Sequence, residues 1–530
     1  MSIASKLLAA ALLVSCGGPT GQPKINAPLL VTLAERELII DGSNFGRSGT
    51  LLVAGRRIPS TDPSVRWSNG RVVTTLPAGV GSGPLTIESG AQTSNVVPLE
   101  VYDYRSWPMA TAVDPVGLPL ALNIDSQQRL WVNLEFGVTF QVFDPATSTV
   151  TALPKPPQPN GPGPFALYVE DLFGVKDVDA PSQLSMLGED VVVDSHGRIW
   201  FSQGGGWLYD REQSKVTPTK DVRIYPNHSR VICWLPATAS YRVYNMPGDR
   251  NEVFGLAWDG TRIWAAASGR TGGGALIAFD PERTPFDAAS PSFDFSTSLD
   301  SWVNRPDGSG YQLYNVPDAT VGPLFMVVDP DGHIWFTTFY GSRIGRLDPT
   351  TGTVDQFPLP RPSTQNPSWI ALHTDGLWRM ALSADGSSLY FDEAFDFEVG
   401  RLDAARARAH PEQCAALDAN GRNPCIATIA VAEPAPQGGK ADFLHTLALD
   451  AAGRLWYTHP GFTDADGKAA GEDALGIVLP DLSYVAHLPS LRRSSDDKTI
   501  GPNGLVLAPT TGDLWFVEYY TRRVSRLHKL

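Results

Sequence analysis

Residues Asp329–Gly352 have the sequence DPDGHIWFTTFYGSRIGRLDPTTG, in which turn signals alternate with apolar runs. The Gly of DPDG supplies the positive φ of a hairpin turn, and HIWFTTF and RIGRL have the β-branched and aromatic composition of strands. The apolar run before this segment and VDQFPLP after it add one strand each. The pattern therefore predicts a four-stranded antiparallel sheet.

The same pattern occurs seven times in the chain. Each copy has an apolar run, a turn that contains Asp or Gly, and an aromatic residue between apolar neighbours. One such sheet cannot bury both of its faces, but seven sheets around an axis can. The repeat therefore predicts an all-β fold, a seven-bladed β-propeller over residues 103–530. The aromatic residues of the seven copies are Trp131, Trp200, Trp264, Trp335, Tyr390, Trp456 and Trp515.

The seventh copy lacks a fourth strand of its own, because the chain given ends at RVSRLHKL (523–530). We expect YDYRSWP (102–108), just before the first copy, to supply the missing strand and to cover an exposed edge. The copies are unevenly spaced, and we assign the extra lengths to loops at about 155–187, 204–240, 270–310 and 404–440.

Residues 27–102 predict a separate small all-β domain, with short strands between Gly, Asn and Pro turns. The strand order, the turn GSNFG at 42–46 and the pair Leu76-Pro77 resemble the IPT/TIG immunoglobulin-like domain. The resemblance implies an immunoglobulin-like β-sandwich that acts as a spacer or docking module.

Residues 1–16, MSIASKLLAAALLVSC, have the charged start and apolar core of a secretory signal peptide. LVSC resembles the lipobox of bacterial lipoproteins, which implies that Cys16 carries a lipid; an ordinary signal peptide with a chance Cys is the alternative. Residues 17–26 would then form a flexible tether. No Asp follows Cys16, which in that family favours the outer membrane of the cell envelope over the inner one.

Composition excludes some partners. The formal net charge of −14 and the lack of a basic run argue against nucleic acid. After the signal there is no apolar segment long enough to span a bilayer and no heptad pattern, so we expect a monomer attached only through its lipid. In an oxidising compartment, Cys414 and Cys425 are expected to form a disulfide, and Cys233 to be a buried small hydrophobic residue.

The repeat wording D-x-x-G-x-[IL]-W-F followed by I-G-R-L-D-P-x-T-G-x-V closely resembles the streptogramin (virginiamycin B) lyase family of seven-bladed propellers. The resemblance covers most of residues 104–530 and is clearest at 323–360. NHL-like and gluconolactonase-like propellers share this repeat style, so it indicates a superfamily before an activity. The lyase resemblance implies a divalent metal, Mg in that family, and a His base that opens a macrocyclic ester by C–O elimination.

The resemblance places the lyase residues on axis-facing loops of the last two blades. His445 matches the family His of the penultimate blade, and Glu518 matches the Glu that follows the last aromatic strand. Gly501 stands where the family has its first Glu, and Asn503 stands in place of the family base. Since Asn cannot accept a proton in this role and Gly offers no metal oxygen, we expect no reaction by the family mechanism.

A second register would use His445 as the base, but it fails because Phe443 and His459 then replace the two carboxylates. A divalent cation held by His445, His459 and Glu518 would suit the ligand preferences of Zn, Mn or Fe. The alternative is that these groups are hydrogen-bonded or hydrated around the channel without a ligand. Further polar residues expected at the same mouth are Glu189, Gln203, Glu252 and Glu393.

Two functions therefore stay open. The first is a lipid-anchored binding or scaffold protein whose propeller mouth holds a small molecule, a glycan or a protein, and the loss of the Glu-x-His pair favours it. The second is a metal-dependent C–O lyase or hydrolase with a remodelled site, which the retention of His445 and Glu518 keeps open. DPDG at 329–332 and DADG at 464–467 resemble calcium loops but lack the later Glu.

Overall fold

The structure is a computed structural model that describes residues 21–112, 117–135, 137, 139–156, 188–203, 207–209, 222–224, 229–247, 252–268, 274–286, 299–317, 322–338, 342–359, 376–394, 397–431, 440–441, 446–459, 462–463, 469–470, 473–491 and 500–530. The chain divides into two compact units. The first contains residues up to Asp103 together with Lys529–Leu530, and the second contains Tyr104–His528.

The second unit is built from four-stranded sheets that follow one another along the chain, and we call them blades 1 to 7. Blade 1 contains β11 (Leu118–Ile124), β12 (Leu130–Glu135), β13 (Gln141–Asp144) and β14 (Thr149–Ala152). Blade 2 contains β15 (Val191–Val193), β16 (Ile199–Gln203), β19 (Arg230–Leu235) and β20 (Ser240–Asn245). Blade 3 contains β21 (Glu252–Trp258), β22 (Ile263–Ser268), β23 (Ala275–Phe279) and β24 (Tyr311–Asn315).

Blade 4 contains β25 (Pro323–Val328), β26 (Ile334–Thr338), β27 (Arg343–Leu347) and β28 (Val354–Pro358). Blade 5 contains β29 (Leu377–Leu382), β30 (Ser388–Glu393), β31 (Glu398–Asp403) and β32 (Ile426–Ala430). Blade 6 contains β34 (Leu447–Leu449), β35 (Leu455–His459), β38 (Ala474–Val478) and β39 (Val485–His487). Blade 7 contains β40 (Pro502–Leu507), β41 (Leu514–Glu518), β42 (Arg523–Lys529) and the end of β10 (Val97–Pro108).

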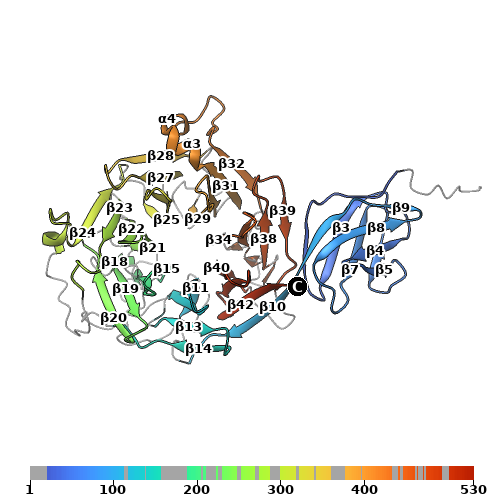
Figure 1. Cartoon of the computed structure of the whole chain (residues 1–530), viewed down its shortest axis with the longest axis horizontal. Coiled ribbons are helices and arrows are strands. Elements are labelled where there is room, and N and C mark those ends of the chain that lie inside the picture. The colour runs from blue at the N-terminus through green and yellow to red at the C-terminus, as the bar shows by residue number, and fades with distance from the viewer. Residues whose placement is uncertain are drawn as a thin grey trace, which may run out of the picture. The chain divides into compact units, whose positions relative to one another are not determined.

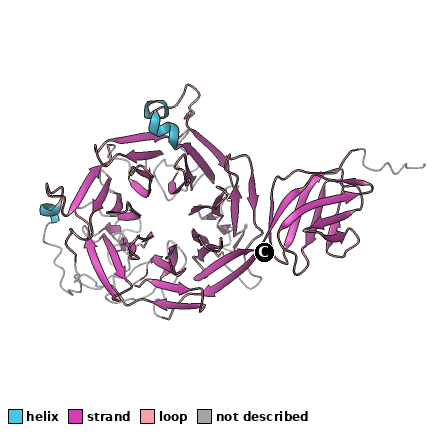
Figure 2. Ribbon diagram, in the orientation of Figure 1, coloured by secondary structure: helices cyan, strands magenta, loops and turns pink. Residues whose placement is uncertain are grey.

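The blades are arranged around a common axis (Figures 1 and 2). The inner strands β11, β15, β21, β25, β29, β34 and β40 each contact the next one, and β40 contacts β11 again. The ring is therefore continuous, as the repeat predicts, although each sheet remains open. Buried side chains of neighbouring blades pack together, for example Trp131 of blade 1 with Ile199 and Val243 of blade 2.

The last blade takes its outer strand from the beginning of the chain, which confirms the expectation for residues 102–108. The backbone N–H of Met109 donates to the carbonyl of Arg522 at 2.9 Å. The Arg523 guanidinium donates to Ser106 Oγ at 2.9 Å. The end of β10 is thus hydrogen-bonded beside β42.

The Asp and Trp of the repeat form a structural pair in blades 1, 2, 3, 4 and 6. In blade 4, Asp329 Oδ1 accepts from the backbone N–H groups of Asp331 and His333, each at 2.9 Å. Its Oδ2 accepts from the indole N–H of the buried Trp335 at 2.9 Å. One carboxylate therefore fixes both the turn and the indole. The same bond joins Asp125 to Trp131, Asp194 to Trp200, Asp259 to Trp264 and Asp450 to Trp456.

Two of the segments expected as loops contain third strands of blades. Strand β19 lies within 204–240 and β23 lies within 270–310. Residues 204–229 separate β19 from β16, whereas only residues 269–274 separate β23 from β22, and the insertion of blade 3 lies between β23 and β24. Other elements inside or near the insertions are β17 (Trp207–Tyr209), β18 (Val222–Ile224), η1 (Leu299–Trp302), α3 (Ala404–Ala409), α4 (Pro411–Cys414), β33 (Lys440–Ala441), β36 (Phe462–Thr463) and β37 (Ala469–Ala470).

The first unit consists of two sheets with one shared core. One sheet has the order β1 (Lys24–Ile25), β3 (Glu37–Ser43), β7 (Arg71–Thr75) and β6 (Val65–Trp67). In the other, β10 is followed by β8 (Gly83–Ser89), β4 (Thr50–Val53) and β5 (Arg56–Pro59), while β2 (Leu30–Leu33) pairs with β10 and β9 (Gln92–Thr93) with β8. Leu38, Ile40, Leu51, Leu85 and Phe45 belong to the shared core.

The ordered part begins earlier than the expected boundary at residue 27. Lys24 and Ile25 pair with Ser43 and Gly42, within the segment expected to be a tether. The Asn95 side chain accepts from the Ile25 N–H at 2.7 Å and donates to its carbonyl at 3.1 Å. Residues 1–16 lie outside the described residues, and no helix in the described part is both long and apolar enough to span a membrane.

Candidate functional site

Glu518 is at the end of β41, and its side chain is fully buried. Its Oε1 accepts from the Tyr104 hydroxyl on β10 and from Ser525 Oγ on β42, the latter at 2.5 Å. Its Oε2 accepts from Thr521 Oγ1. The carboxylate thus joins three strands of blade 7 through hydroxyl donors.

Asn503, which the lyase resemblance aligns with the base, is on β40 and is 4% exposed. Its Oδ1 accepts from Thr446 Oγ1 of blade 6 at 3.0 Å and from the backbone N–H of Gly504 at 2.9 Å. The strand has a bulge between Asn503 and Leu505. The amide therefore stabilises an irregular inner strand and links two blades, and its chemistry offers no proton acceptor for a lyase step.

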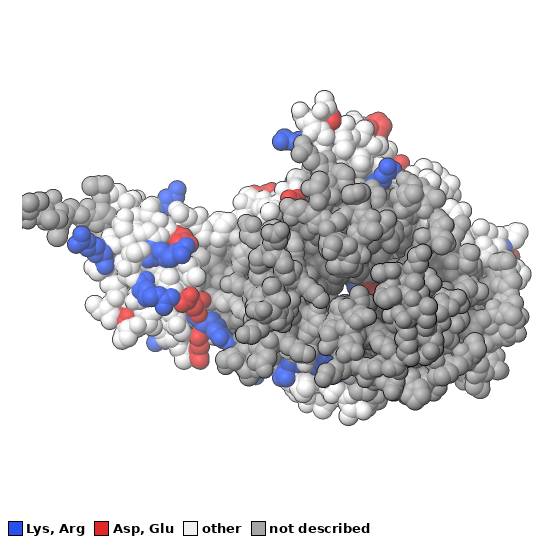
Figure 3. Space-filling view, turned by 180° about the vertical axis from the view of Figure 1, so that it is seen from behind, with Lys and Arg blue, Asp and Glu red and all other residues white. Residues whose placement is uncertain are grey.

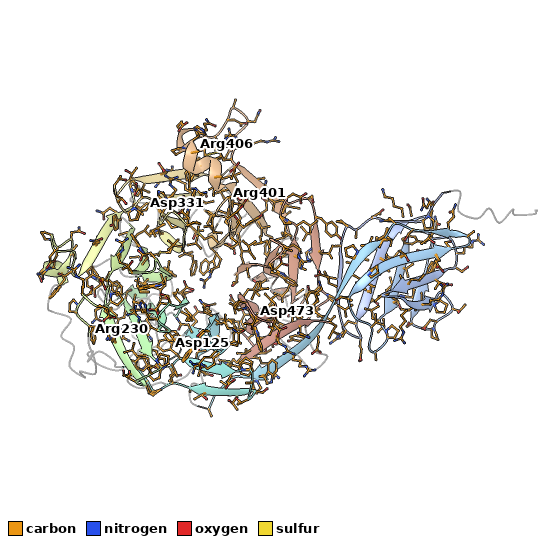
Figure 4. The ribbon with its side chains drawn as sticks, viewed as in Figure 1. Asp125, Arg230, Asp331, Arg401, Arg406 and Asp473 are labelled. Carbon is orange, nitrogen blue, oxygen red and sulfur yellow. A yellow bond between two sulfur atoms is a disulfide. The ribbon has the colours of Figure 1, made fainter. Side chains whose placement is uncertain are left out.

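Gly501, where the family has its first Glu, has a backbone that disfavours a side chain. Its φ is +57°, and a Cβ there would lie 2.7 Å from the Tyr520 ring. The neighbouring carboxylate of Asp473, labelled in Figure 4, accepts from the backbone N–H groups of Ile500 at 3.0 Å and Gly501 at 3.3 Å. A Glu at position 501 would require this segment to change conformation.

The structure describes only some of the other residues expected at the site. His445 lies outside the described residues, as does DADG at 464–467, and His459 ends β35 with its side chain outside the described part. The metal set of His445, His459 and Glu518 stays a prediction.

Cys414 and Cys425 are joined by a disulfide with a Cα–Cα distance of 5.5 Å, and Cys233 is a buried free cysteine. Cys16 and Glu252 lie outside what the structure describes of side chains, whereas Glu189, Gln203 and Glu393 are buried.

A residue that was not expected at the site, Arg379, forms contacts between blades that are not neighbours in the ring. It is on β29, where the pairing with β30 is irregular between Leu377 and Met380. Its Nη1 donates to Asp190 Oδ1 at 2.8 Å, and its Nη2 donates to the backbone oxygen of Glu189 at 2.7 Å. Since Asp190 precedes β15, Arg379 connects blade 5 to blade 2 across the axis. In the space-filling view from behind, small blue and red areas of basic and acidic side chains are visible at the middle of the ring (Figure 3).

Asp190 extends this contact to further blades. Its Oδ2 accepts from the backbone N–H of Leu256 in blade 3 at 2.8 Å. Its backbone oxygen accepts from Asn133 Nδ2 of blade 1 at 2.9 Å, and its N–H donates to Ser202 Oγ at 2.9 Å. We call the group of Arg379, Asp190, Asn133 and Asp392 the axial cluster.

Asp392 of β30 accepts hydrogen bonds from the backbone of the Arg379 segment. Its Oδ1 accepts from the backbone N–H groups of Arg379 at 2.7 Å and Trp378 at 3.1 Å. Its Oδ2 has no hydrogen-bond partner in the described structure. Burial raises the pKa of Asp392 to about 8. The carboxyl is therefore mostly protonated at neutral pH.

Small and aromatic residues of neighbouring blades shape the space beside Arg379. Its guanidinium carbon lies 3.6 Å from the centroid of the Phe325 ring in blade 4, a cation–π contact. Gly255 of blade 3 allows Phe325 to approach closely, because a Cβ on Gly255 would lie 2.7 Å from the Phe325 Cα. The innermost layer thus contains one cation packed on an aromatic ring.

The DPDGH turn of blade 4 brings together Asp329, Asp331 and His333, whose potential ligand atoms lie within 4.8 Å of one another. Arg408 of α3 lies 3.7 Å from each of the two carboxylates, so a cation is already present. Burial alone would raise the pKa of Asp329, but hydrogen bonds from Trp335 and from the His333 backbone outweigh it and lower the pKa. The turn is therefore a hairpin with a charged neighbour, and it gives no support to a metal site.

The chain is similar to virginiamycin B lyase from Staphylococcus aureus, with 12% identity, a TM-score of 0.50, and coverage of 81% of this chain and 100% of that one. The fold is a β-propeller. The chain also aligns with an auxiliary nutrient binding protein from Bacteroides thetaiotaomicron, with 9% identity, a TM-score of 0.42, and coverage of 96% and 98%.

Identities this low show the fold alone. No protein-family model matches the chain, and no curated protein matches it in sequence. The function of the propeller must therefore be inferred from its own residues.

Arg379 was absent from the residues that the sequence predicts for the site. Its signal is the segment LWRMAL, in which one basic residue interrupts an apolar inner strand. Within the seven described inner strands, no other position carries Lys or Arg. A search for charged residues in the apolar runs, rather than in the loops after the aromatic residues, would have found it.

Proposed function

We propose that this chain is a ligand-binding β-propeller of the bacterial cell envelope that does not catalyse streptogramin cleavage. The signal peptide directs export, and Cys16 carries the lipid. A short tether and an IPT/TIG immunoglobulin-like spacer then present the propeller from the outer membrane. The mouth of the propeller around the axis binds a small molecule or glycan.

The observation that carries the proposal is the state of Asn503. By the lyase resemblance it replaces the family base, and its Oδ1 already accepts two hydrogen bonds, of which the one from Thr446 joins blade 6 to blade 7. Gly501 offers no metal oxygen and has a backbone that resists a side chain. These residues support a propeller that has lost the lyase chemistry and keeps the ring.

The axial cluster supports binding. A ligand site needs a few oriented polar groups on a rigid frame, and residues on strands are held more firmly than residues on loops. Arg379 and Asp190 come from inner strands or their immediate starts and are fixed by contacts with several blades. The alternative, a metal-dependent lyase or hydrolase, gains no support from Glu518, whose two oxygens accept from hydroxyl groups.

A thermal-shift screen tests the binding role. The protein without its first sixteen residues is heated with neutral, acidic and basic sugars and small molecules, and the melting temperature is compared with that of the protein alone. We expect at least one class to raise the melting temperature in a saturable way, because a ligand that binds only the folded state stabilises it. Failure of every class to do so contradicts the binding role.

A cleavage assay tests the loss of lyase chemistry. We expect no opening of a streptogramin B ring by the natural sequence with added magnesium, monitored by mass spectrometry. The Asn503→His variant should also be inactive, because position 501 still lacks the carboxylate. Cleavage by the natural sequence would show that a different residue acts as the base.

A further inference from the structure

Arg379 has more hydrogen-bonding capacity than its known contacts use. A guanidinium carries five N–H groups, and two of them donate to Asp190 and to the Glu189 backbone. Its Nε is buried and has no hydrogen-bond partner in the described structure. The side chain keeps 15% of its surface exposed. Since Nη1 and Nη2 each carry a second N–H, these two groups are the donors that a further acceptor could use.

In the described structure, one carboxylate forms an ion pair with Arg379. Asp190 contacts the guanidinium directly, whereas Glu189 contributes its backbone oxygen. Asp392 beneath the strand is mostly neutral at pH 7, because burial raises its pKa to about 8. The Arg379 charge therefore faces one close carboxylate with a known contact rather than two.

Two aromatic side chains, Phe325 and Trp378, lie close to Arg379. The Phe325 ring lies against the guanidinium, and the ring centroids of Phe325 and Trp378 are 5.6 Å apart. Trp378 is partly exposed next to Arg379. An arginine beside aromatic rings combines a fork of donors for a carboxylate with an apolar surface for the rest of a ligand.

The geometry points to a site at the propeller axis for a ligand that carries a carboxylate, with Arg379 as the residue that recognises it. The carboxylate accepts from the second N–H groups of Nη1 and Nη2, while Asp190 and the Glu189 backbone oxygen hold the guanidinium in place. Trp378 is placed to contact the body of the ligand. This inference rests on the proposed binding function and adds the chemical class of the ligand.

Binding of matched probes tests the class. D-glucuronate, D-glucose and acetate are titrated into the protein by calorimetry at pH 7 and constant ionic strength, with sodium chloride as the reference salt. We expect glucuronate to bind and glucose, which has the same ring without the carboxylate, to bind at least tenfold more weakly. Binding of acetate would assign recognition to the carboxylate alone, whereas binding of glucuronate only would add the sugar ring.

Substitutions at two arginines of blade 5 test the role of Arg379. Arg379→Gln should abolish glucuronate binding, and Arg379→Lys, which keeps the charge but loses the fork, should weaken it at least tenfold. Arg401→Gln is the matched control, because Arg401 is on β31, the third strand of the same blade from the axis, and donates to the Pro480 carbonyl (Figure 4). It should bind as the natural sequence does. If Arg379→Gln fails to fold, Arg379→Lys supplies the comparison.

Three results would overturn the inference: equal binding of glucuronate and glucose, carboxylate binding that both Arg379 variants retain, or no response to any carboxylate. If neutral or basic ligands still stabilise the protein in the thermal-shift screen, the binding function stands and only the carboxylate class is wrong. If nothing binds in either experiment, both proposals are wrong.

Discussion

At the scale of single residues, the carboxylates of the hairpin turns have the clearest roles. Asp329 accepts from two backbone N–H groups and from the indole of Trp335, which is fully buried. Without the carboxylate, these donors would be left without their partner in an interior where an unmade hydrogen bond is costly. The turn Asp therefore contributes to stability through the second strand as well as through the hairpin.

Replacing Asp329 with Ala should lower the free energy of unfolding by roughly 2–4 kcal/mol, because several donors lose their acceptor. Denaturant unfolding followed by tryptophan fluorescence measures the change. Asp331→Ala is the control, since the Asp331 side chain is 65% exposed, and it should change stability by less than about 0.5 kcal/mol. Equal effects of the two substitutions would contradict the role of the Asp–Trp pair.

Asp392 should make the protein less stable as the pH rises. Burial raises its pKa from 3.8 to about 8, so between these values the folded protein holds a proton that the unfolded chain has released. Stability from this group is complete below about pH 4 and is lost up to about pH 8, at roughly 1.4 kcal/mol per pH unit at most. The loss then levels off.

Asp392→Asn removes this titration, so the variant should gain stability relative to the natural protein between pH 5 and pH 8. Melting temperatures at pH 5, 6, 7 and 8 give the comparison. A constant difference between the two proteins over this range would show that Asp392 is ionised in the folded state.

Residue-level prediction from the sequence was uneven for a physical reason. The Trp and Asp of the repeat are visible because each is needed for packing in blade after blade. Arg379 occurs once, and its role depends on Asp190, which lies 189 positions away in the chain. Pattern alone cannot identify a contact that is made between distant blades and only once.

At the scale of elements, the end of β10 supplies the outer strand of blade 7. Its Tyr104 hydroxyl donates to Glu518, and its Ser106 accepts from Arg523 in β42. The Tyr104 ring also stacks with Phe516, with centroids 6.1 Å apart. Without this segment, blade 7 would expose the edge of β42.

A chain that begins at Ala110 should therefore melt at a lower temperature than one that begins at Asp103, which keeps the end of β10. Both lack the first unit, so the comparison isolates the outer strand. Differential scanning calorimetry measures the two transitions, and equal melting temperatures would rule out a stabilising role for the strand.

Elements were predicted best where strands are joined by short turns. The first two strands of each copy are linked by a tight hairpin, so composition and turn chemistry agree. Strand β19 follows a long connection, and an apolar run after an insertion has no fixed distance from its partner. Strand β23 follows a short connection but is separated from β24 by the insertion, so the sequence pattern places it, like α3 and α4, in a loop.

At the scale of the whole molecule, the lipid anchor is the main untested expectation. Cys16→Ser should move the protein from the membrane fraction to the soluble fraction after ultracentrifugation of lysed cells. Ser15→Ala is the control, because it keeps a small residue before the cysteine, and it should remain with the membranes. A Cys16→Ser protein that still sediments through detergent-free washes would contradict the lipoprotein assignment.

The outer strand of blade 7 also has a consequence for when the protein can fold. Tyr104 and Glu518 are 414 positions apart, so blade 7 joins strands from two distant parts of the chain. The ring cannot be completed before residues 502–529 of blade 7 have been synthesised, and non-local pairing of this kind is slow to form. Until then, blade 1 has no neighbour on one side, and its apolar face is open to aggregation. Complete folding of the propeller should therefore be delayed until blade 7 is available to pair with the end of β10.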